Sequence, residues 1–392
     1  MRKMAMEREW FRYGCACVLA FSLVLPGLST RAQSDTPTAL ATKLDGPSGL
    51  ALSERGDLYI SDSRQHRVLR VTAAGIVSVV AGTGKDGYSG DGGPAHLARL
   101  DTPTGLIVRR DGALYVADTN NHVVRRVGVD GVIATVAGNG KKGFAGDGGA
   151  ATSARLAHPV DVESSTDGIL YIADGGGIRT VSPSGTMQTV SKLTGLALAI
   201  DHLNNLYISQ SRKVVKLTGS GAVEVVAGSD YLGGDGDGRK ATSARLSNAL
   251  GLAVDTEGNL YISDQNNLRI RKVSTDGLIS TVVGDATYSA IHNAYIPKLY
   301  AWPTALAVDK AGNIYYASGG EAVKDYAVPQ AYSPSLGAYQ ANSAHTIAQT
   351  VSDIARGVVY GKDATYLPWN GARFIFRKSV DGVASPVVGK LR

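Results

Sequence analysis

The stretch that decides the fold runs from Pro47 to Gly82: PSGLAL at 47–52, GDLYISD at 56–62, RVLRV at 67–71 and IVSVVAG at 76–82. Each of these segments is five to seven residues long and rich in Val, Ile, Leu and Tyr. Gly, Asp and Ser separate them, as turn residues separate short β-strands. We therefore expect four consecutive antiparallel strands.

The same unit returns along the chain. It recurs as PTGLIV at 103–108, GALYVAD at 112–118, VVRRV at 123–127 and VIATVAG at 132–138. The tyrosine of the second segment recurs at Tyr171, Tyr207, Tyr261 and Tyr315, and a degraded copy follows Tyr366 with FIFRK at 374–378 and VASPVVG at 383–389. A repeat of this size determines the fold before any single motif is weighed.

One four-stranded sheet of this size cannot bury both of its faces. Radial stacking of such sheets around a channel buries them and shortens the exposed edges. The sequence therefore predicts an all-β fold, a β-propeller of four-stranded blades that spans residues 44–392. Seven tyrosine positions favour seven blades, and six blades is the alternative.

Residues 1–32 have the pattern of an export signal. Basic residues precede an apolar run from Gly14 to Leu25, and Thr30-Arg31-Ala32 provides a cleavage motif. We expect cleavage after Ala32, a secreted or periplasmic mature protein, and no membrane span, because the apolar run is shorter than the roughly 20 residues of a spanning helix. Residues 33–43 follow as an N-terminal segment, a candidate for a ring-closing strand.

Charge and composition exclude several classes of function. Residues 1–32 carry five Lys or Arg and two Asp or Glu, so their removal lowers the net charge from +6 to +3, and we expect no nucleic-acid partner. Both cysteines, Cys15 and Cys17, lie in this segment, so the mature chain has no thiolate metal site. The histidines share no spacing, and no Gly-x-Ser-x-Gly motif occurs.

The third segments carry a family motif. Asp118-Thr-Asn-Asn-His122-Val-Val-Arg-Arg-Val127 nearly matches the triplet Asn-His-Leu, with Val123 in place of Leu, and residues 264–273 are a looser copy without the histidine. On these residues the chain resembles the NHL-repeat family. The glycine-rich stretch 82–94 is similar to inserts of secreted bacterial members. The resemblance implies a β-propeller, usually of six blades.

Three inserts rich in Gly and Asp join one unit to the next. They occupy residues 83–100, 139–156 and 229–246. Their cores place Asp91, Asp147 and Asp235 among glycines, and a hard cation such as calcium takes carboxylate oxygens. The inserts lack the acidic run of a dedicated calcium loop. We therefore favour a structural interpretation, in which glycines form tight turns and the aspartates accept backbone amides.

The third unit breaks the pattern of the innermost strand. Where the other units place mostly Gly or Ala two residues apart, it has Asp161 and Glu163, and a period of two puts both on one face. We identify them as candidates for a ligand or metal site in the channel, with His158 at the channel mouth and Arg356 as a partner from the seventh copy. The alternative interpretation is a water-filled channel that tolerates two acids.

These observations favour a secreted, monomeric scaffold that binds a protein or glycan partner through its loops, above all the inserts and the irregular stretch 330–350, without catalysis or a cofactor. The alternative is a metal-dependent lyase or lactone hydrolase with its site in the central channel. Asp161 and Glu163 would be its metal ligands or general base, and His158 its acid. A divalent cation is the cofactor that this alternative requires.

Overall fold

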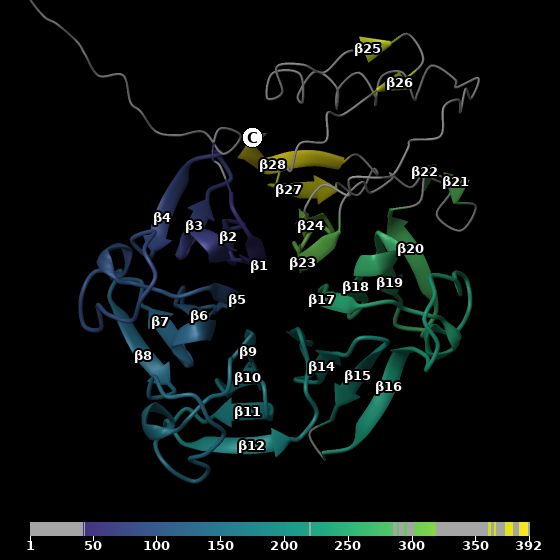
Figure 1. The fold of residues 1–392 in the computed structure, drawn as a ribbon. Helices are drawn as coiled ribbons and strands as arrows, with labels where there is room; N and C mark the ends of the chain where they lie inside the picture. Colours follow the sequence, from purple (N-terminus) through teal and green to yellow (C-terminus); the bar gives the residue numbers. More distant parts are fainter. Residues whose placement is uncertain are drawn as a thin grey trace, which may run out of the picture. The chain divides into compact units, whose positions relative to one another are not determined.

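In the computed structural model, short antiparallel sheets follow one another along the chain (Figure 1). The structure describes residue 42 and residues 44–318, apart from 219–220, 285–287, 290–293 and 296–301, together with four strands between residues 360 and 390. The expected signal sequence, the segment 33–43 except Thr42, the stretch 330–350 and Arg356 lie outside the described residues.

Five sheets have the strand order expected from the repeat, with each strand paired to the next. Sheet 1 contains β1 (Pro47–Leu52), β2 (Leu58–Asp62), β3 (Arg67–Val71) and β4 (Val77–Ala81). Sheet 2 contains β5 (Pro103–Val108), β6 (Leu114–Asp118), β7 (Val123–Val127) and β8 (Ile133–Ala137). Sheet 3 contains β9 (Asp161–Ser164), β10 (Leu170–Asp174), β11 (Gly177–Val181) and β12 (Met187–Ser191). Sheet 4 contains β13 (Leu198–Ile200), β14 (Leu206–Ser209), β15 (Lys213–Leu217) and β16 (Val223–Gly228). Sheet 5 contains β17 (Ala249–Val254), β18 (Leu260–Asp264), β19 (Arg269–Val273) and β20 (Ile279–Val283).

Sheet 6 is discontinuous in sequence. β23 (Pro303–Val308) pairs with β24 (Ile314–Ser318), and the next strands of the sheet are β27 (Arg373–Lys378) and β28 (Ala384–Lys390). The last two segments of our expected seventh copy are therefore the outer strands of sheet 6, because they complete the open edge of β24. The described residues thus supply six four-stranded sheets, which favours six blades over the seven that we expected.

Two short hairpins complete the described strands. They are β21 (Tyr288–Ser289) with β22 (Ala294–Tyr295), and β25 (Tyr360–Gly361) with β26 (Ala364–Thr365).

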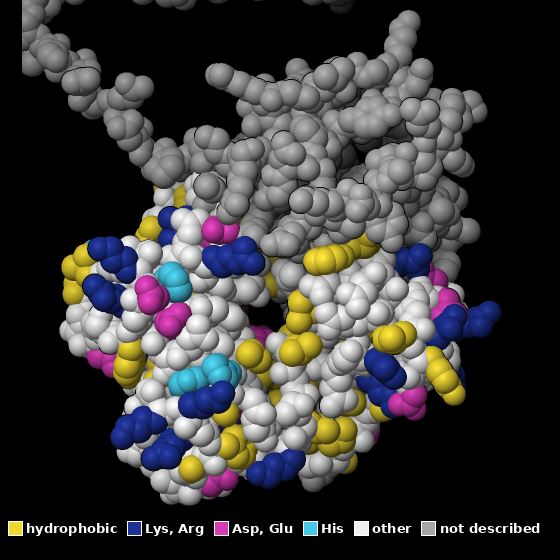
Figure 2. Space-filling view, in the orientation of Figure 1, with side chains coloured by type: hydrophobic (Ala, Val, Ile, Leu, Met, Phe, Trp, Pro, Cys, Tyr) yellow, Lys and Arg dark blue, Asp and Glu magenta, His cyan; other side chains and the backbone are white. Residues whose placement is uncertain are grey.

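The innermost strands form a closed series. β1 contacts β5, β5 contacts β9, and the series continues through β13, β17 and β23 back to β1. Between sheets 6 and 1, Ala305 and Ala307 pack with Leu50 and Ile60 in one apolar cluster. Figure 2 shows a hollow at the hub where these strands meet. The ring confirms the predicted β-propeller of four-stranded blades.

The apolar core lies between neighbouring sheets. Val68 of sheet 1 packs in one cluster with Leu106 and Val116 of sheet 2 and with Ala95 and Leu100 of the insert between them. Each sheet therefore buries its faces against its neighbours, as the small size of one sheet requires.

Buried carboxylates fasten the ends of the blades. The second strands of sheets 1, 2, 3 and 5 each end in a buried aspartate: Asp62, Asp118, Asp174 and Asp264. In each sheet, Oδ1 of this aspartate accepts a backbone N–H at 2.7 Å. The donors are, in the same order, Asp45, Asp101, Ala157 and Ser247. These donors lie in the segments that lead into the first strands. Each bond joins the end of a second strand to the entry of the first strand of the same sheet.

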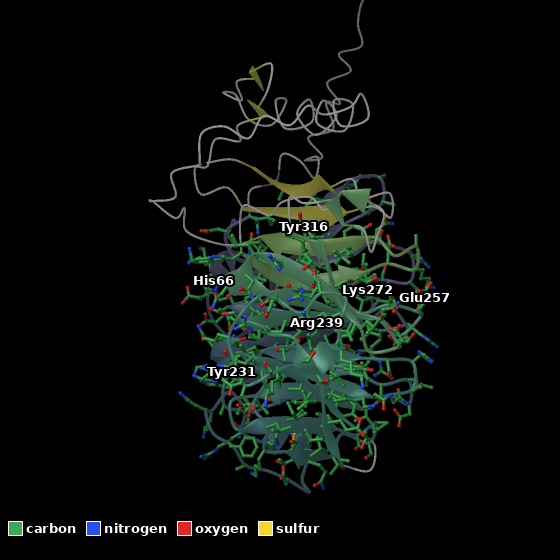
Figure 3. The ribbon with its side chains drawn as sticks, turned by 90° about the vertical axis from the view of Figure 1, so that its right-hand side faces the viewer. His66, Tyr231, Arg239, Glu257, Lys272 and Tyr316 are labelled. Atoms are coloured by element: carbon green, nitrogen blue, oxygen red, sulfur yellow. The ribbon has the colours of Figure 1, made fainter. Side chains whose placement is uncertain are left out.

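The ring has two faces with different loops. The turns after the second strands contain η2 (Ser63–Gln65), η4 (Thr119–Asn121) and η7 (Gln265–Asn267), and the inserts contain η3 (Ala95–Leu97), η5 (Ala151–Ser153) and η6 (Ala241–Ser243). These loops lie at the same strand ends, and we call their side the insert face. The hairpin turns between first and second strands, and between third and fourth strands, form the hairpin face. Edge-on in Figure 3, His66 and Tyr231 lie toward one side and Glu257 toward the other.

Candidate functional site

Asp161 and Glu163 lie on β9, the innermost strand of sheet 3. The pairing of β9 with β10 places Asp161 opposite Ala173 and Glu163 opposite Tyr171. The two carboxylates share one face of the strand, because residues two apart point the same way. The bond from Leu198 to Asp161 shows that this face is turned toward sheet 4. The acids therefore lie beside the hub, between sheets 3 and 4. We had expected them on the channel wall alone.

The carboxylate of Asp161 joins two sheets. Its Oδ1 accepts the N–H of Val162 at 2.8 Å, and its Oδ2 accepts the N–H of Leu198 on β13 at 2.7 Å. At the preceding junction, the N–H of Gly105 in sheet 2 donates to the carbonyl of Val160 in sheet 3 at 2.9 Å, and the hydroxyl of Thr104 donates to the same carbonyl at 2.8 Å. Asp161 thus makes a link between blades that requires no ligand.

Gly105 allows β5 to lie close to β9. A Cβ atom built on Gly105 would lie 1.9 Å from Oδ1 and 2.5 Å from the backbone Cα of Asp161. The approach of the two strands therefore excludes a side chain at position 105.

Both acids have raised pKa values. Burial raises the pKa of Asp161 to about 7, although the two amide hydrogen bonds oppose this rise. Burial also raises the pKa of Glu163 well above its ordinary value, and the charge of Asp161 raises it further. A carboxyl group of this kind can hold or release a proton near neutral pH, which is useful in proton transfer. Among the described residues, no side-chain hydrogen bond joins Glu163 to another blade.

His158 lies against His122 and not against the acids. The two imidazoles meet edge to face, with ring centroids 4.5 Å apart and an interplanar angle of 75°. Within the part of the chain that the structure describes, no hydrogen bond or ion pair joins His158 to Asp161 or Glu163. The contact of His158 with His122 was not among our expectations. The turn after one second strand lies beside the entry to the next innermost strand, which sequence spacing does not show.

The aspartates of the first two inserts pair with buried arginines. Arg125 Nη2 lies 2.5 Å from Asp91 Oδ1, and Arg179 Nη2 lies 2.7 Å from Asp147 Oδ1. Neither arginine side chain has exposed surface. The second oxygen of Asp91 accepts the N–H of Thr135 on β8 at 3.1 Å. These contacts agree with the structural interpretation of Asp91 and Asp147.

In the third insert, the aspartate that pairs with the buried arginine lies two residues after Asp235, the residue that we expected to correspond to Asp91 and Asp147. The buried arginine, Arg271, pairs with Asp237, and Asp237 also accepts the N–H of Thr281 at 3.0 Å. Asp235 instead pairs with the exposed Arg245 at 2.7 Å. Aligning Asp235 with Asp91 was wrong, because either aspartate of the run Gly234-Asp-Gly-Asp-Gly238 fits the pattern.

The three arginines were missed in the sequence, although a signal for them is present. They occupy the third position of β7, β11 and β19, in the sheets that follow an insert. Sheets 1 and 4, which follow no insert, have Leu69 and Val215 at this position. Arginine in a register that otherwise holds an apolar residue therefore indicates a carboxylate partner in the insert.

Each insert also covers the sheet that follows it. Arg125 lies 5.1 Å from the ring centroid of Tyr88, and Arg179 lies 4.5 Å from that of Phe144, both rings belonging to the inserts. Bridges between insert and outer strand occur in all three cases: Pro94 with Val132, Ala150 with Thr186, and Lys240 with Leu278. The inserts are thus integral parts of blades 2, 3 and 5.

No group of three or more His, Cys, Asp or Glu in the described residues could hold a metal ion. None of the helices in the same part of the chain is long and apolar enough to cross a membrane.

The closed ring of four-stranded antiparallel sheets defines the class of this protein as a β-propeller. The chain belongs to the NHL-repeat β-propeller family: the family model described as the Teneurin NHL domain matches residues 53–144, 140–200 and 232–323.

The relatives are distant and much longer. Teneurin-3 of Mus musculus is 30% identical over 294 residues, which are 68% of this chain and 10% of that protein. Protein SUPPRESSOR OF QUENCHING 1, chloroplastic, of Arabidopsis thaliana is 27% identical over 339 residues, which are 76% of this chain and 32% of that protein. The chain therefore corresponds to a small part of each relative.

Among solved structures, a gluconolactonase from Xanthomonas campestris is similar, with 18% identity, a TM-score of 0.49, and coverage of 72% of this chain and 86% of that one. A similarity at this level supports no argument about activity.

Replacing a buried arginine tests the anchoring of an insert. Arg125→Met is expected to lower the free energy of unfolding by about 3–5 kcal/mol, because it leaves the buried carboxylate of Asp118 without its cation and releases Asp91. Arg126→Met, on the same strand but outside the core, should change it by about 0.5 kcal/mol or less. Denaturant unfolding of both variants measures the difference. Equal, small losses would contradict the anchoring role.

The raised pKa of Glu163 predicts a pH-dependent stability. The folded protein binds this proton more tightly than the unfolded chain, so stability is lost as pH rises from the ordinary pKa of about 4.3 through the higher folded value. Glu163→Gln removes the loss. Its melting temperature relative to the wild type should therefore increase between pH 5 and pH 9, whereas Glu257→Gln in an exposed turn should show no trend. A constant difference for Glu163→Gln would contradict the raised pKa.

Proposed function

We propose that the chain is an exported, six-bladed NHL propeller that binds a protein partner through its insert face and catalyses no reaction. Export rests on the signal-like pattern of residues 1–32. The proposal of binding rests on one observation of the surface, the position of the exposed aromatic side chains.

Three exposed aromatic side chains of the described residues belong to loops of the insert face. Tyr88 and Tyr231 belong to inserts, and Trp302 directly precedes β23; they are 44%, 73% and 39% exposed. In the hairpin turns of sheets 1 and 4, which follow no insert, the large exposed apolar side chains of the described residues are aliphatic: Ile76 and Leu203. Tyrosine and tryptophan are enriched at protein interfaces, and they contribute most of the binding energy there. The insert face therefore has the composition of an interface.

Aliphatic neighbours favour a protein over a glycan. Leu97, Leu196 and Leu232 lie on the same face and are 63%, 44% and 51% exposed. Leucine buries its surface against apolar side chains, whereas the hydroxyl groups of a sugar gain nothing from it. A mixed surface of aromatic and leucine side chains thus suits a protein partner with an apolar patch of its own.

The inserts present these side chains on a fixed frame. The phenol of Tyr88 lies over the buried guanidinium of Arg125 and hydrogen-bonds to Thr135 on β8 at 2.8 Å. A side chain that is already ordered loses less conformational entropy when a partner binds. The buried arginines therefore support recognition indirectly, by holding the binding face in place.

Photo-crosslinking tests the proposal. A benzoylphenylalanine at position 231 or 302 in the producing cells should yield a discrete protein adduct, and the same residue at positions 76 or 203 on the hairpin face should not. The protein identified in the adduct, once purified, should bind Tyr231→Ala at least about tenfold more weakly than wild type and Leu203→Ala equally well. Adducts from both faces alike, no adduct, or an adduct removed by glycosidase would contradict a protein partner on the insert face.

The second candidate is a lyase or lactone hydrolase at the hub, which the raised pKa of Glu163 favours. Because the carboxylate of Asp161 already accepts two backbone N–H groups, Glu163 would be the general base of such an enzyme. The two candidates differ in the effect of Glu163→Gln, which would abolish turnover at the hub but leave the crosslinks at the insert face unchanged.

A further inference from the structure

The repeat places two equivalent residue pairs on the insert face. His66 and His122 end η2 and η4, and both have left-handed backbones, with φ of 46° and 57°. Thr102 and His158 lie before the innermost strands of the next sheets and are also left-handed, with φ of 54° and 64°. His66 therefore corresponds to His122, and Thr102 corresponds to His158.

The two pairs differ in whether Nδ1 of the first histidine has a hydrogen-bond partner. Nδ1 of His66 accepts the N–H of Thr102 at 3.2 Å. Nδ1 of His122 is buried and has no hydrogen-bond partner among the described residues. The ring of His158 lies beside it instead. A buried imidazole nitrogen without a partner is costly, so this pair is incomplete in a way that the His66 pair is not.

We propose that His122 and His158 together bind a divalent transition-metal ion, with Cu²⁺ preferred. Imidazole nitrogen is the ligand that copper, nickel and zinc take from proteins without thiolates. With metal–nitrogen bonds of about 2.0–2.1 Å, two imidazoles at right angles around one ion have ring centroids about 4.5 Å apart. The observed separation is 4.5 Å.

Cu²⁺ and Ni²⁺ take square-planar or tetragonal sites with nitrogen and oxygen ligands, whereas Zn²⁺ prefers a tetrahedron. Copper also binds most tightly of the divalent first-row ions. Two imidazoles fill two positions, and water or a group from a bound molecule fills the others.

The positive charge of Lys142 acts on His122. Lys142 opposes a cation as well as a proton, but it is exposed and screened by water.

The chain supplies matched variants for the test. His158→Thr introduces the residue that stands at 102, and His122→Leu introduces the residue that stands at 268 in the equivalent turn, where Leu268 also has a left-handed backbone. Each replacement is thus one that the fold already accepts at an equivalent place. His66→Ala is the control, because its pair is complete without a metal.

The experiment is a Cu²⁺ titration of the tag-free full-length protein, followed by calorimetry and pulsed electron paramagnetic resonance. Wild type and His66→Ala should bind one more equivalent of Cu²⁺ than either His158→Thr or His122→Leu, or bind it at least about tenfold more tightly. The spectrum should show two equatorial imidazoles, and affinity should fall from Cu²⁺ to Ni²⁺ to Zn²⁺. Binding that is unchanged in both variants, a single imidazole in the spectrum, or loss of binding in His66→Ala would overturn the proposal. The site does not depend on a protein partner, so these results are separate from the crosslinking experiment.

Discussion

Three guanidinium groups without exposed surface decide how the blades and their inserts fit together. A buried cation is stable only when a carboxylate and further hydrogen-bond acceptors surround it. For Arg125, Arg179 and Arg271, the insert that precedes the sheet supplies the acid. If an insert detached from its blade, the guanidinium of the arginine would be exposed to water or left buried without a carboxylate. Sheets 1 and 4, with Leu69 and Val215 at the same position, follow no insert.

This constraint turns glycine-rich loops into a fixed surface. The inserts carry exposed tyrosine and leucine side chains, and their backbones pair with the outer strands of the blades below. Binding residues on a rigid scaffold recognise a partner at a small entropic cost. The hub, by contrast, contains two carboxylates where the other innermost strands have mostly small side chains, and there Asp161 links sheets 3 and 4 and Glu163 accompanies it. The two locations would serve different purposes, recognition at the insert face and proton transfer or blade linkage at the hub.

The sequence predicted what depends on local pattern and failed where distant contacts decide. The repeated tyrosines identified four-stranded units, because the pattern of each strand lies within a few consecutive residues. The sequence did not decide between seven blades and six, since FIFRK at 374–378 has the pattern of a third strand whichever sheet it joins, and its pairing with β24 places it in sheet 6. A period of two correctly put Asp161 and Glu163 on one face, but the period does not say which neighbour that face meets. Asp237 was missed because Asp235 fits the same pattern, and the meeting of His122 with His158 follows from the ring and not from their spacing.

Amide hydrogen exchange tests most directly whether the inserts belong to the blades. The N–H groups of Gly92, Gly148 and Gly238 donate to the carbonyls of Ile133, Met187 and Ile279 at 2.8 Å in each case. If the buried arginines hold the inserts, these three amides should exchange as slowly as those of the outer strands that they pair with, because they open only when the blade opens. Exchange of the three glycines at the rate of an unprotected loop, while the outer strands stay protected, would show that the inserts move freely and would contradict the fixed binding face.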